Sequence, residues 1–170
     1  MNLKKLAEKP MSPDTFIAVI EIPLGSNVKY ELDKETETIF VDRFAFTSMV
    51  YPLNYGFVPG TKADDGDPVD VLVVTSTPIA PGSAIYCRVI GMLIMEDEEG
   101  MDEKLLAVPL PKVDVFTSHI NSLDDITSAV KNKIKHFFEH YKELEAGKWV
   151  KVKDWKGKKE AEAYLEKALR

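Results

Sequence analysis

The chain has 170 residues, of which 45% are hydrophobic and 29% are charged. A chain of this size and composition can bury a core of its own, which excludes a largely disordered protein and indicates a single domain over residues 1–170. Its net charge of −6, from 22 basic and 28 acidic residues, argues against a general nucleic-acid-binding protein, which needs a positive field.

The first 110 residues predict short strands separated by turns. Residues 1–13 are expected to form a charged N-terminal arm, with room for a short helix before Pro10 and Pro13. The apolar or alternating segments that predict strands are Phe16–Ile22, Val28–Asp33, Thr38–Arg43, Val69–Val74, Ile85–Met95 and Leu105–Val108. A series of short strands of this kind is typical of a barrel or a sandwich.

The last part of the chain has a helical period. Apolar residues from Ile126 to Tyr141 recur at the spacing of one helix face. Asp124 or Asp125 is the predicted N-cap, and Gly147 is the predicted end. A second helix is expected over Lys159–Leu169. The whole pattern predicts an α+β fold, mainly β, in which two helices are appended to a small barrel.

The cysteine content and the N-terminus predict the compartment. The single cysteine, Cys87, excludes an internal disulfide and is typical of a protein from a reducing compartment. The basic N-terminus lacks a following apolar segment, and no apolar stretch approaches the ~18 residues that a membrane span needs. We therefore expect a cytoplasmic protein without a membrane partner.

The acidic residues are unevenly distributed. Ten of the 28 acidic residues lie in residues 64–70 and 96–103, and neither segment contains a lysine or an arginine. Like charges at this density repel one another unless a cation is present.

The first acidic segment has the features of a cation site. Asp65, Asp67 and Asp70 lead into a predicted strand, Gly66 allows a sharp bend, and Pro68 stiffens the loop. Several oxygen ligands on a rigid turn suit a hard divalent cation. The spacing does not match an EF-hand loop. The alternative interpretation is a solvated acidic turn.

The second acidic segment is interpreted as a hairpin tip over Glu96–Gly100. Asp97 and Asp102 flank this tip and can face each other, while Asp102 and Lys104 share one strand face. The alternative is a charged hairpin tip without a ligand. The other acidic residues after Asp97 are interpreted as solvated: Glu98, Glu99 and Glu103.

Basic and phenolic side chains elsewhere complete a set that suits a multiply charged phosphate ligand. The set comprises Lys29, Arg43, Tyr51, Tyr55, Lys104, Tyr141 and Lys142. Each residue alone has an ordinary interpretation, as a surface lysine or as a tyrosine at the edge of the core.

Taken together, these residues resemble the family I soluble inorganic pyrophosphatases in their bacterial form. The segment that carries the resemblance is Asp65-Gly-Asp-Pro-Val-Asp-Val71, with Asp64 as an extra acid beside it. Further matches follow in order: Glu21-Ile-Pro, Lys29-Tyr-Glu31, Phe40-Val-Asp-Arg43, Tyr51-Pro-x-Asn-Tyr55-Gly and His136-Phe-Phe-Glu-His-Tyr-Lys142.

The resemblance implies a five-stranded OB-like barrel with two helices. It also implies hydrolysis of pyrophosphate to two phosphates by water that Mg²⁺ activates, with Asp67 as the general base and without a covalent intermediate. The implied ligands of three or four Mg²⁺ ions are Asp65, Asp70, Asp97, Asp102 and Glu31.

The same resemblance implies roles for the remaining residues. Lys29, Arg43 and Tyr55 join Asp67 as catalytic residues. The implied substrate-binding residues are Lys29, Glu31, Arg43, Tyr55, Lys104, Tyr141 and Lys142. Glu21 and Tyr51 are implied supporting residues. A homohexamer built as a dimer of trimers is implied as well, with His136 and His140 between subunits.

Two other functions fit parts of the sequence. An OB-type module could bind single-stranded nucleic acid through its tyrosines and its basic C-terminal end, although the clustered acids oppose this. A metal-dependent phosphatase could instead act on an organic diphosphate.

Overall fold

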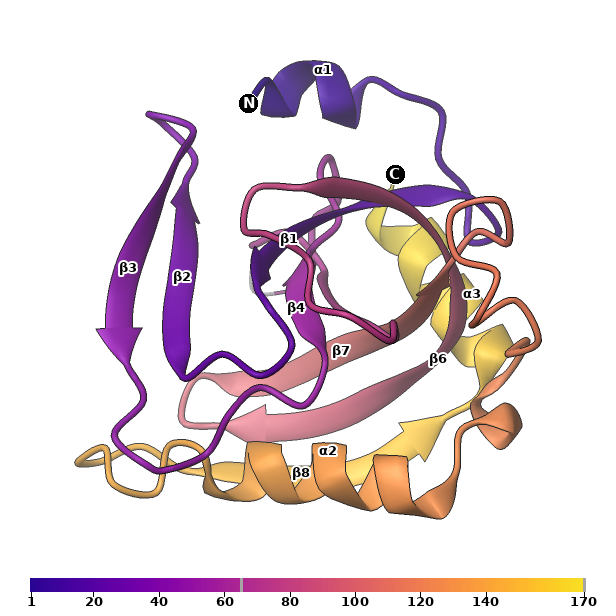
Figure 1. Cartoon of the computed structure of the whole chain (residues 1–170). Helices are drawn as coiled ribbons and strands as arrows, with labels where there is room; N and C mark the ends of the chain where they lie inside the picture. Colours follow the sequence, from indigo (N-terminus) through magenta and orange to yellow (C-terminus); the bar gives the residue numbers. More distant parts are fainter. Residues whose placement is uncertain (65, 170) are drawn as a thin grey trace.

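The main sheet of the computed structural model contains six strands within the described residues, 1–64 and 66–169. In sheet order they are β1 (Phe16–Ile22), β4 (Asn54–Phe57), β5 (Asp70–Val73), β7 (Gly100–Pro109), β6 (Ala84–Asp97) and β8 (Val150–Lys156). Because β1 also pairs with β6, the first five strands form a ring (Figure 1). This ring and the appended helices confirm the predicted OB-like α+β class.

A separate two-stranded sheet stands beside the ring. It consists of β2 (Val28–Asp33) and β3 (Thr38–Phe44), an antiparallel hairpin that lies apart from the ring in Figure 1. The tip of this hairpin points toward the short helix α1 (Leu3–Ala7) near the N-terminus. The hairpin therefore forms a separate layer beside the ring.

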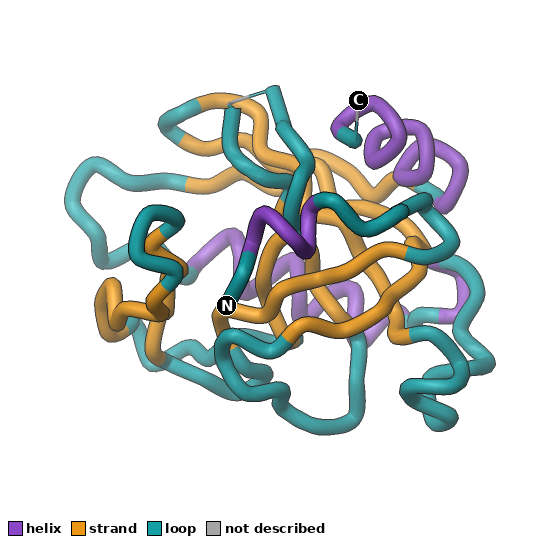
Figure 2. Tube along the Cα trace, turned by 90° about the horizontal axis from the view of Figure 1, so that it is seen from above, coloured by secondary structure: helices purple, strands orange, loops and turns teal. Residues whose placement is uncertain are grey.

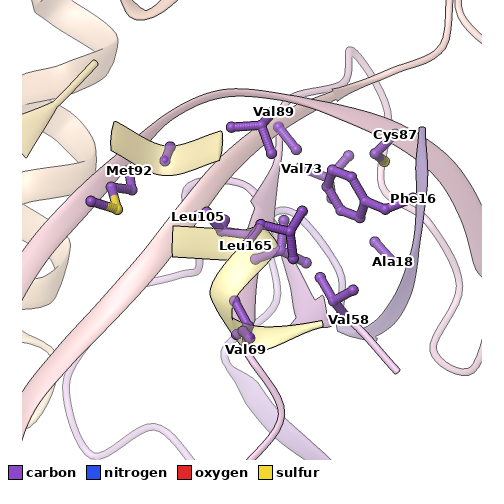
Figure 3. Close-up of a cluster of buried hydrophobic side chains, with 14 of the residues drawn as sticks. Phe16, Ala18, Val58, Val69, Val73, Cys87, Val89, Met92, Leu105 and Leu165 are labelled. Atoms are coloured by element: carbon purple, nitrogen blue, oxygen red, sulfur yellow. The ribbon is translucent and has the colours of Figure 1, made fainter. Parts of the chain in front are cut away.

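Two apolar clusters fill the space between the strands and the two long helices. Successive residues of β5 join different clusters, Val71 the first and Leu72 the second, because neighbours along a strand face opposite sides. Helix α3 (Lys158–Ala168) covers the first cluster with Leu165, beside Phe16 and Leu105 (Figure 3). Figure 2 shows α3 next to the C-terminus and α1 next to the N-terminus, on different sides of the strands.

The second cluster lies under helix α2 (Ser128–His140), which buries Ile134, Phe137 and Phe138. Cys87 belongs to the first cluster, and its burial raises the pKa of its thiol, so it is not a reactive group. No helix among the described residues is long and apolar enough to cross a membrane.

The structure corrects the predicted ends of the first long helix. Thr127 is its N-cap, through a hydrogen bond from the Val130 N–H to the Thr127 hydroxyl, and the helix ends at His140, well before Gly147. Asp125 instead accepts hydrogen bonds from the backbone of Asn121 and Ser122 in a 3-10 turn, η1 (Leu123–Asp125). Asp125 therefore caps the 3-10 turn that precedes the helix, and not the helix itself.

Two strands were not predicted. β4 is short and follows a Pro/Asn-containing segment, and β8 alternates lysines with only a few apolar residues. The other predicted strands are confirmed, with β6 and β7 longer at the hairpin tip than their apolar residues indicated. The second predicted helix matches α3 within one residue.

Gly56 allows β4 to lie close against β1. A Cβ atom at this position would lie 1.9 Å from the carbonyl oxygen of Val19 and 2.8 Å from the Cα of Ile20. We therefore expect Gly56→Ala to lower the free energy of unfolding by at least about 3 kcal/mol, since backbone atoms of a ring strand must move.

Urea unfolding measures this effect, with Gly157→Ala as the matched control. At Gly157 the nearest atom to a new Cβ is the flexible end of Glu160, at 3.3 Å. Equal stabilities of the two variants would contradict the proposed close approach of β4 and β1.

Candidate active site

A cavity of about 460 Å³ lies between the β2–β3 hairpin, the β6–β7 tip and the chain that follows α2. A smaller cavity of about 190 Å³ continues from it toward the hairpin turn and shares part of its lining. The charged residues that line the larger cavity are Lys29, Glu31, Arg43, Asp67, Asp70, Asp97, Glu99, Asp102, Lys104, Lys142, Glu145 and Lys148. The acids and bases predicted from the sequence therefore meet in one place.

The loop of the first acidic segment leads directly into the ring. Asp65 lies outside the described residues. Gly66 has φ of +94°, which confirms the predicted need for glycine at this bend. The Thr61 hydroxyl accepts a hydrogen bond from the Val69 N–H at 2.9 Å, and the Asp67 carbonyl accepts one from the Ala63 N–H at 2.7 Å. These bonds place the loop over the cavity.

Lys104 lies between two of the predicted metal ligands. In the parallel pair of β5 and β7, Asp70 and Lys104 are register partners. The buried Lys104 ammonium donates to Asp70 and, at 2.6 Å, to Asp102. Burial alone would lower the pKa of Lys104, but the two carboxylates outweigh it and raise that pKa. Burial is also the largest cause of the raised pKa of Asp102.

Lys142 forms the corresponding pair with Asp97. Its ammonium lies 2.9 Å from an oxygen of Asp97, which also accepts a hydrogen bond from the Glu99 N–H. Burial tends to raise the pKa of Asp97, but these two hydrogen bonds outweigh it and lower the pKa. Asp97 is therefore an anion that a cation already stabilises.

The hairpin presents the other two predicted phosphate-binding cations. Lys29 and Arg43 are register partners across β2 and β3. Asp42 lies 3.0 Å from the Lys29 ammonium and 2.6 Å from the Arg43 guanidinium. Glu31 also pairs with Lys29, at 3.3 Å. Each cation is thus held in place before any substrate binds.

Three acidic residues pair with cations of the cavity but were missed or misinterpreted in the sequence. Asp42 lies inside the matched segment Phe40–Arg43, directly before Arg43, so its position was a usable signal. Glu145 pairs with Arg43 at 3.3 Å and had no signal of its own. Glu98 was predicted to be solvated, which is wrong: it is mostly covered and pairs with Lys148 and Lys142.

The predicted tyrosines form one aromatic group with Phe137. The ring centroids of Tyr51 and Tyr55 lie 5.7 Å apart, and the Tyr141 ring stacks on Phe137 at 5.0 Å. Burial is the largest cause of the raised pKa of all three phenols. They therefore stay protonated at neutral pH and can donate hydrogen bonds. Tyr55 and Tyr141 line the larger cavity, and Tyr51 lies behind them.

Glu21 lies at the inner end of the smaller cavity, where it accepts a hydrogen bond from the Leu32 N–H at 2.8 Å. Burial, with smaller contributions from Asp70 and Glu31, raises the pKa of Glu21 to about 7. This carboxyl group links β1 to the hairpin strand β2 and is protonated more readily than an exposed one.

We expect Glu21→Gln to stabilise the metal-free chain above pH 7. Ionisation of Glu21 is less favourable in the folded chain, so wild-type stability falls as pH rises from about 4.5 to 7. The amide keeps the hydrogen bond to Leu32 and removes this loss, so the variant should be more stable by about 1–2 kcal/mol at pH 8 and equal near pH 4.5. Urea unfolding in EDTA at pH 8 and at pH 4.5 measures the stability of the variant and of the wild type. A stability difference that does not depend on pH would contradict the proposed ionisation.

The two predicted intersubunit histidines lie away from the two cavities. His136 and His140 are on α2 with ring centroids 4.5 Å apart, and His140 pairs with Glu143 at 3.1 Å. Neither lines the larger or the smaller cavity.

The donor set fits a hard divalent cation such as Mg²⁺. Five predicted carboxylates line the larger cavity, and such cations prefer oxygen ligands: Glu31, Asp67, Asp70, Asp97 and Asp102. Among the described residues, no three acidic, histidine or cysteine side chains converge as a ready-made cage. Lys104 and Lys142 instead occupy the space beside these acids, so positive charge is already favoured there.

The chain is similar to known proteins over nearly its whole length. The family model described as inorganic pyrophosphatase matches residues 18–170. An inorganic pyrophosphatase of Aquifex pyrophilus is 56% identical over 169 residues, which is 99% of this chain and 96% of that protein. One of Aeropyrum pernix is 53% identical over 165 residues, 97% of this chain and 94% of that protein.

Solved structures agree with these relatives. The inorganic pyrophosphatase of Thermus thermophilus matches with a TM-score of 0.94 at 43% identity, over 99% of this chain and 97% of that one. The structure of an inorganic pyrophosphatase from Coxiella burnetii matches with a TM-score of 0.91 at 51% identity, over 94% of this chain and 95% of that one.

Proposed function

The chain belongs to the inorganic pyrophosphatase family and hydrolyses pyrophosphate, and from this premise we propose a mechanism in which water attacks directly and Asp67 is the general base. The observation that carries the proposal is the lining of the larger cavity, where carboxylates face lysine and arginine side chains across a space suited to a small, highly charged anion. The carboxylates alone would repel that substrate, so it needs the cations that face them.

Mg²⁺ is the proposed cofactor, with three or four ions in each active site. The residues that would hold it are Asp70, Asp97, Asp102 and Glu31, together with Asp65, which lies outside the described residues. When bound, the ions would lower the pKa of a coordinated water and neutralise negative charge on pyrophosphate.

Asp67 is proposed to accept the proton of the attacking water. It lines both cavities, next to the Asp70 that begins β5. Its side chain is 72% exposed, so solvent water reaches it. A carboxylate within hydrogen-bond reach of the attacking oxygen can act as the base.

The cations and phenols are proposed to bind the substrate and stabilise the leaving phosphate. Lys29, Arg43 and Lys142 can each exchange a carboxylate partner for a phosphate oxygen, and charge-assisted hydrogen bonds of this kind are strong. Lys104 adds a fourth cation, and Tyr55 and Tyr141 add neutral donors. Glu21 and Tyr51 are proposed to support these residues from behind.

Direct attack by water agrees with the residues at hand. Among the described residues that line the two cavities there is no serine, cysteine or histidine. A covalent intermediate through one of these groups therefore has no nucleophile there. No covalent intermediate is proposed.

The test is phosphate release from pyrophosphate in parallel reactions with Mg²⁺, Ca²⁺ and EDTA. We expect release with Mg²⁺ and none with EDTA, and little release from ADP or ATP. Faster release from ADP than from pyrophosphate would favour the phosphatase of organic diphosphates. A gel shift of single-stranded nucleic acid that survives EDTA would favour the nucleic-acid-binding module.

Assembly and location are proposed from the family. We propose a homohexamer, a dimer of trimers, in which His136 and His140 lie at contacts between subunits, and a cytoplasmic location. The exposure of His136 on α2 is compatible with such a contact.

A further inference from the structure

An ion pair bridges the smaller cavity from the hairpin to the first acidic loop. The Lys34 ammonium, in the turn between β2 and β3, lies 2.6 Å from Oδ1 of Asp67. The two side chains are 58% and 72% exposed, and both line this cavity. An ion pair this exposed contributes at most about 1 kcal/mol to stability. Its location beside the proposed general base is therefore more informative than its energy.

The turn that carries Lys34 has a defined conformation. The backbone N–H and the hydroxyl of Thr36 both donate to Oδ1 of Asp33 at 2.6 Å. Glu37, next in the chain, has φ of +52°, which is unfavourable for a residue with a side chain. Contacts from outside the turn must compensate for this conformation.

The N-terminal arm, residues 1–13, supplies those contacts. Oε1 of Glu37 accepts a hydrogen bond from the Leu3 N–H at 2.9 Å, although the two residues are far apart in sequence. A third apolar cluster joins the same three parts of the molecule: Leu3 and Leu6 from the arm, Leu32 and Ile39 from the hairpin, and Val19 and Phe57 from the ring. The arm thus fixes the hairpin tip against the ring.

From these contacts we infer that Lys34 is a positioning residue for Asp67, and that the N-terminal arm holds Lys34 in place through Glu37. The inference rests on the proposed role of Asp67. An ammonium bound at one carboxylate oxygen restricts rotation of the carboxylate, so the direction of its other oxygen is fixed relative to the cavity. A general base must lie within hydrogen-bond reach of its proton, and a small misplacement slows the reaction.

The experiment compares kcat, KM and Mg²⁺ affinity for Lys34→Met, Lys34→Arg, Asp67→Asn and the double variant Lys34→Met/Asp67→Asn. We expect Lys34→Met to lower kcat about three- to fivefold, in line with the energy of the ion pair, with KM within about twofold. Lys34→Arg should restore most of kcat because it keeps a cation that binds carboxylate. Mg²⁺ affinity, measured by titration calorimetry, should not change. Lys159→Met, at an exposed position of α3, is the control.

The double variant separates the two hypotheses. If Lys34 acts through Asp67, Lys34→Met should have no further effect in the Asp67→Asn background. An undiminished loss of kcat there, a raised KM with unchanged kcat, or a wild-type kcat for Lys34→Met would each overturn the inference. A wild-type kcat for Asp67→Asn would instead overturn the proposed general base.

A second pair of variants tests the arm. Glu37→Ala removes the acceptor of the Leu3 N–H, whereas Glu37→Gln keeps a carbonyl oxygen in its place. We expect Glu37→Ala to lower kcat about threefold, Glu37→Gln to match the wild type, and Glu37→Ala to add nothing in the Lys34→Met background. A wild-type kcat for Glu37→Ala would overturn the role of the arm.

Discussion

Replacing Asp67 by Asn is expected to lower kcat for pyrophosphate by about 10²- to 10⁴-fold. The amide has nearly the shape of the carboxylate but cannot accept the proton of the attacking water. Because the proposed ligands of Mg²⁺ are other residues, metal affinity should change little. Steady-state kinetics and calorimetric titration of Mg²⁺ measure the two effects separately.

The matched control for Asp67→Asn is Asp64→Asn. It removes the same charge from the same loop, but Asp64 pairs with Lys167 of α3 at 2.9 Å and lies outside the two cavities. We expect its kcat to stay within about twofold of the wild type. If Asp67→Asn lost metal affinity as much as turnover, Asp67 would be a ligand and not the base.

Replacing Asp70 by Asn is expected to remove both activity and tight Mg²⁺ binding, with kcat lowered at least about 10³-fold. Asp70 is a proposed Mg²⁺ ligand at the start of β5. It is also one of two carboxylates that neutralise the buried Lys104. The substitution should therefore lower the free energy of unfolding of the metal-free chain by about 1–3 kcal/mol as well.

A double variant distinguishes the two roles of Asp70. In Asp70→Asn/Lys104→Met the buried ammonium is gone but Asp102 loses its cation as well, so only part of the lost stability should return, while activity and Mg²⁺ binding stay absent. Urea unfolding in EDTA and calorimetric titration measure these properties. Recovery of Mg²⁺ binding in the double variant would show that the unpaired lysine, and not a missing ligand, caused the loss.

The sequence predicts the apolar strands of the main sheet better than β4 and β8. Strands such as Phe16–Ile22 are apolar at nearly every position, because both of their sides face a cluster, and such runs are recognisable without tertiary information. β4 contains Gly56 and follows Pro52, so its propensity opposes a strand, and only its pairing with β1 on one side and β5 on the other explains it. β8 is partly exposed beside β6, and its lysines conceal the pattern.

The same distinction applies to the site. Residues with a motif, such as Asp67, Asp70 and Arg43, could be predicted, and the structure brings them to one cavity. Glu145 and Lys34 could not, because their partners lie far away in sequence and only the folded hairpin brings them together. The N-cap of α2 was mistaken for a different reason: Asp125 and Thr127 are both good capping residues, and the 3-10 turn takes the first.

The pairing of Lys104 with Asp70 and Asp102 has a consequence for how the chain matures. Many small metal-binding domains fold only when the ion arrives, since their ligands repel one another without it. Here Lys104 already places a positive charge beside the carboxylates of Asp70 and Asp102. We therefore expect the polypeptide to close its ring without Mg²⁺, so that loading of the proposed ion is a reversible step on a finished scaffold.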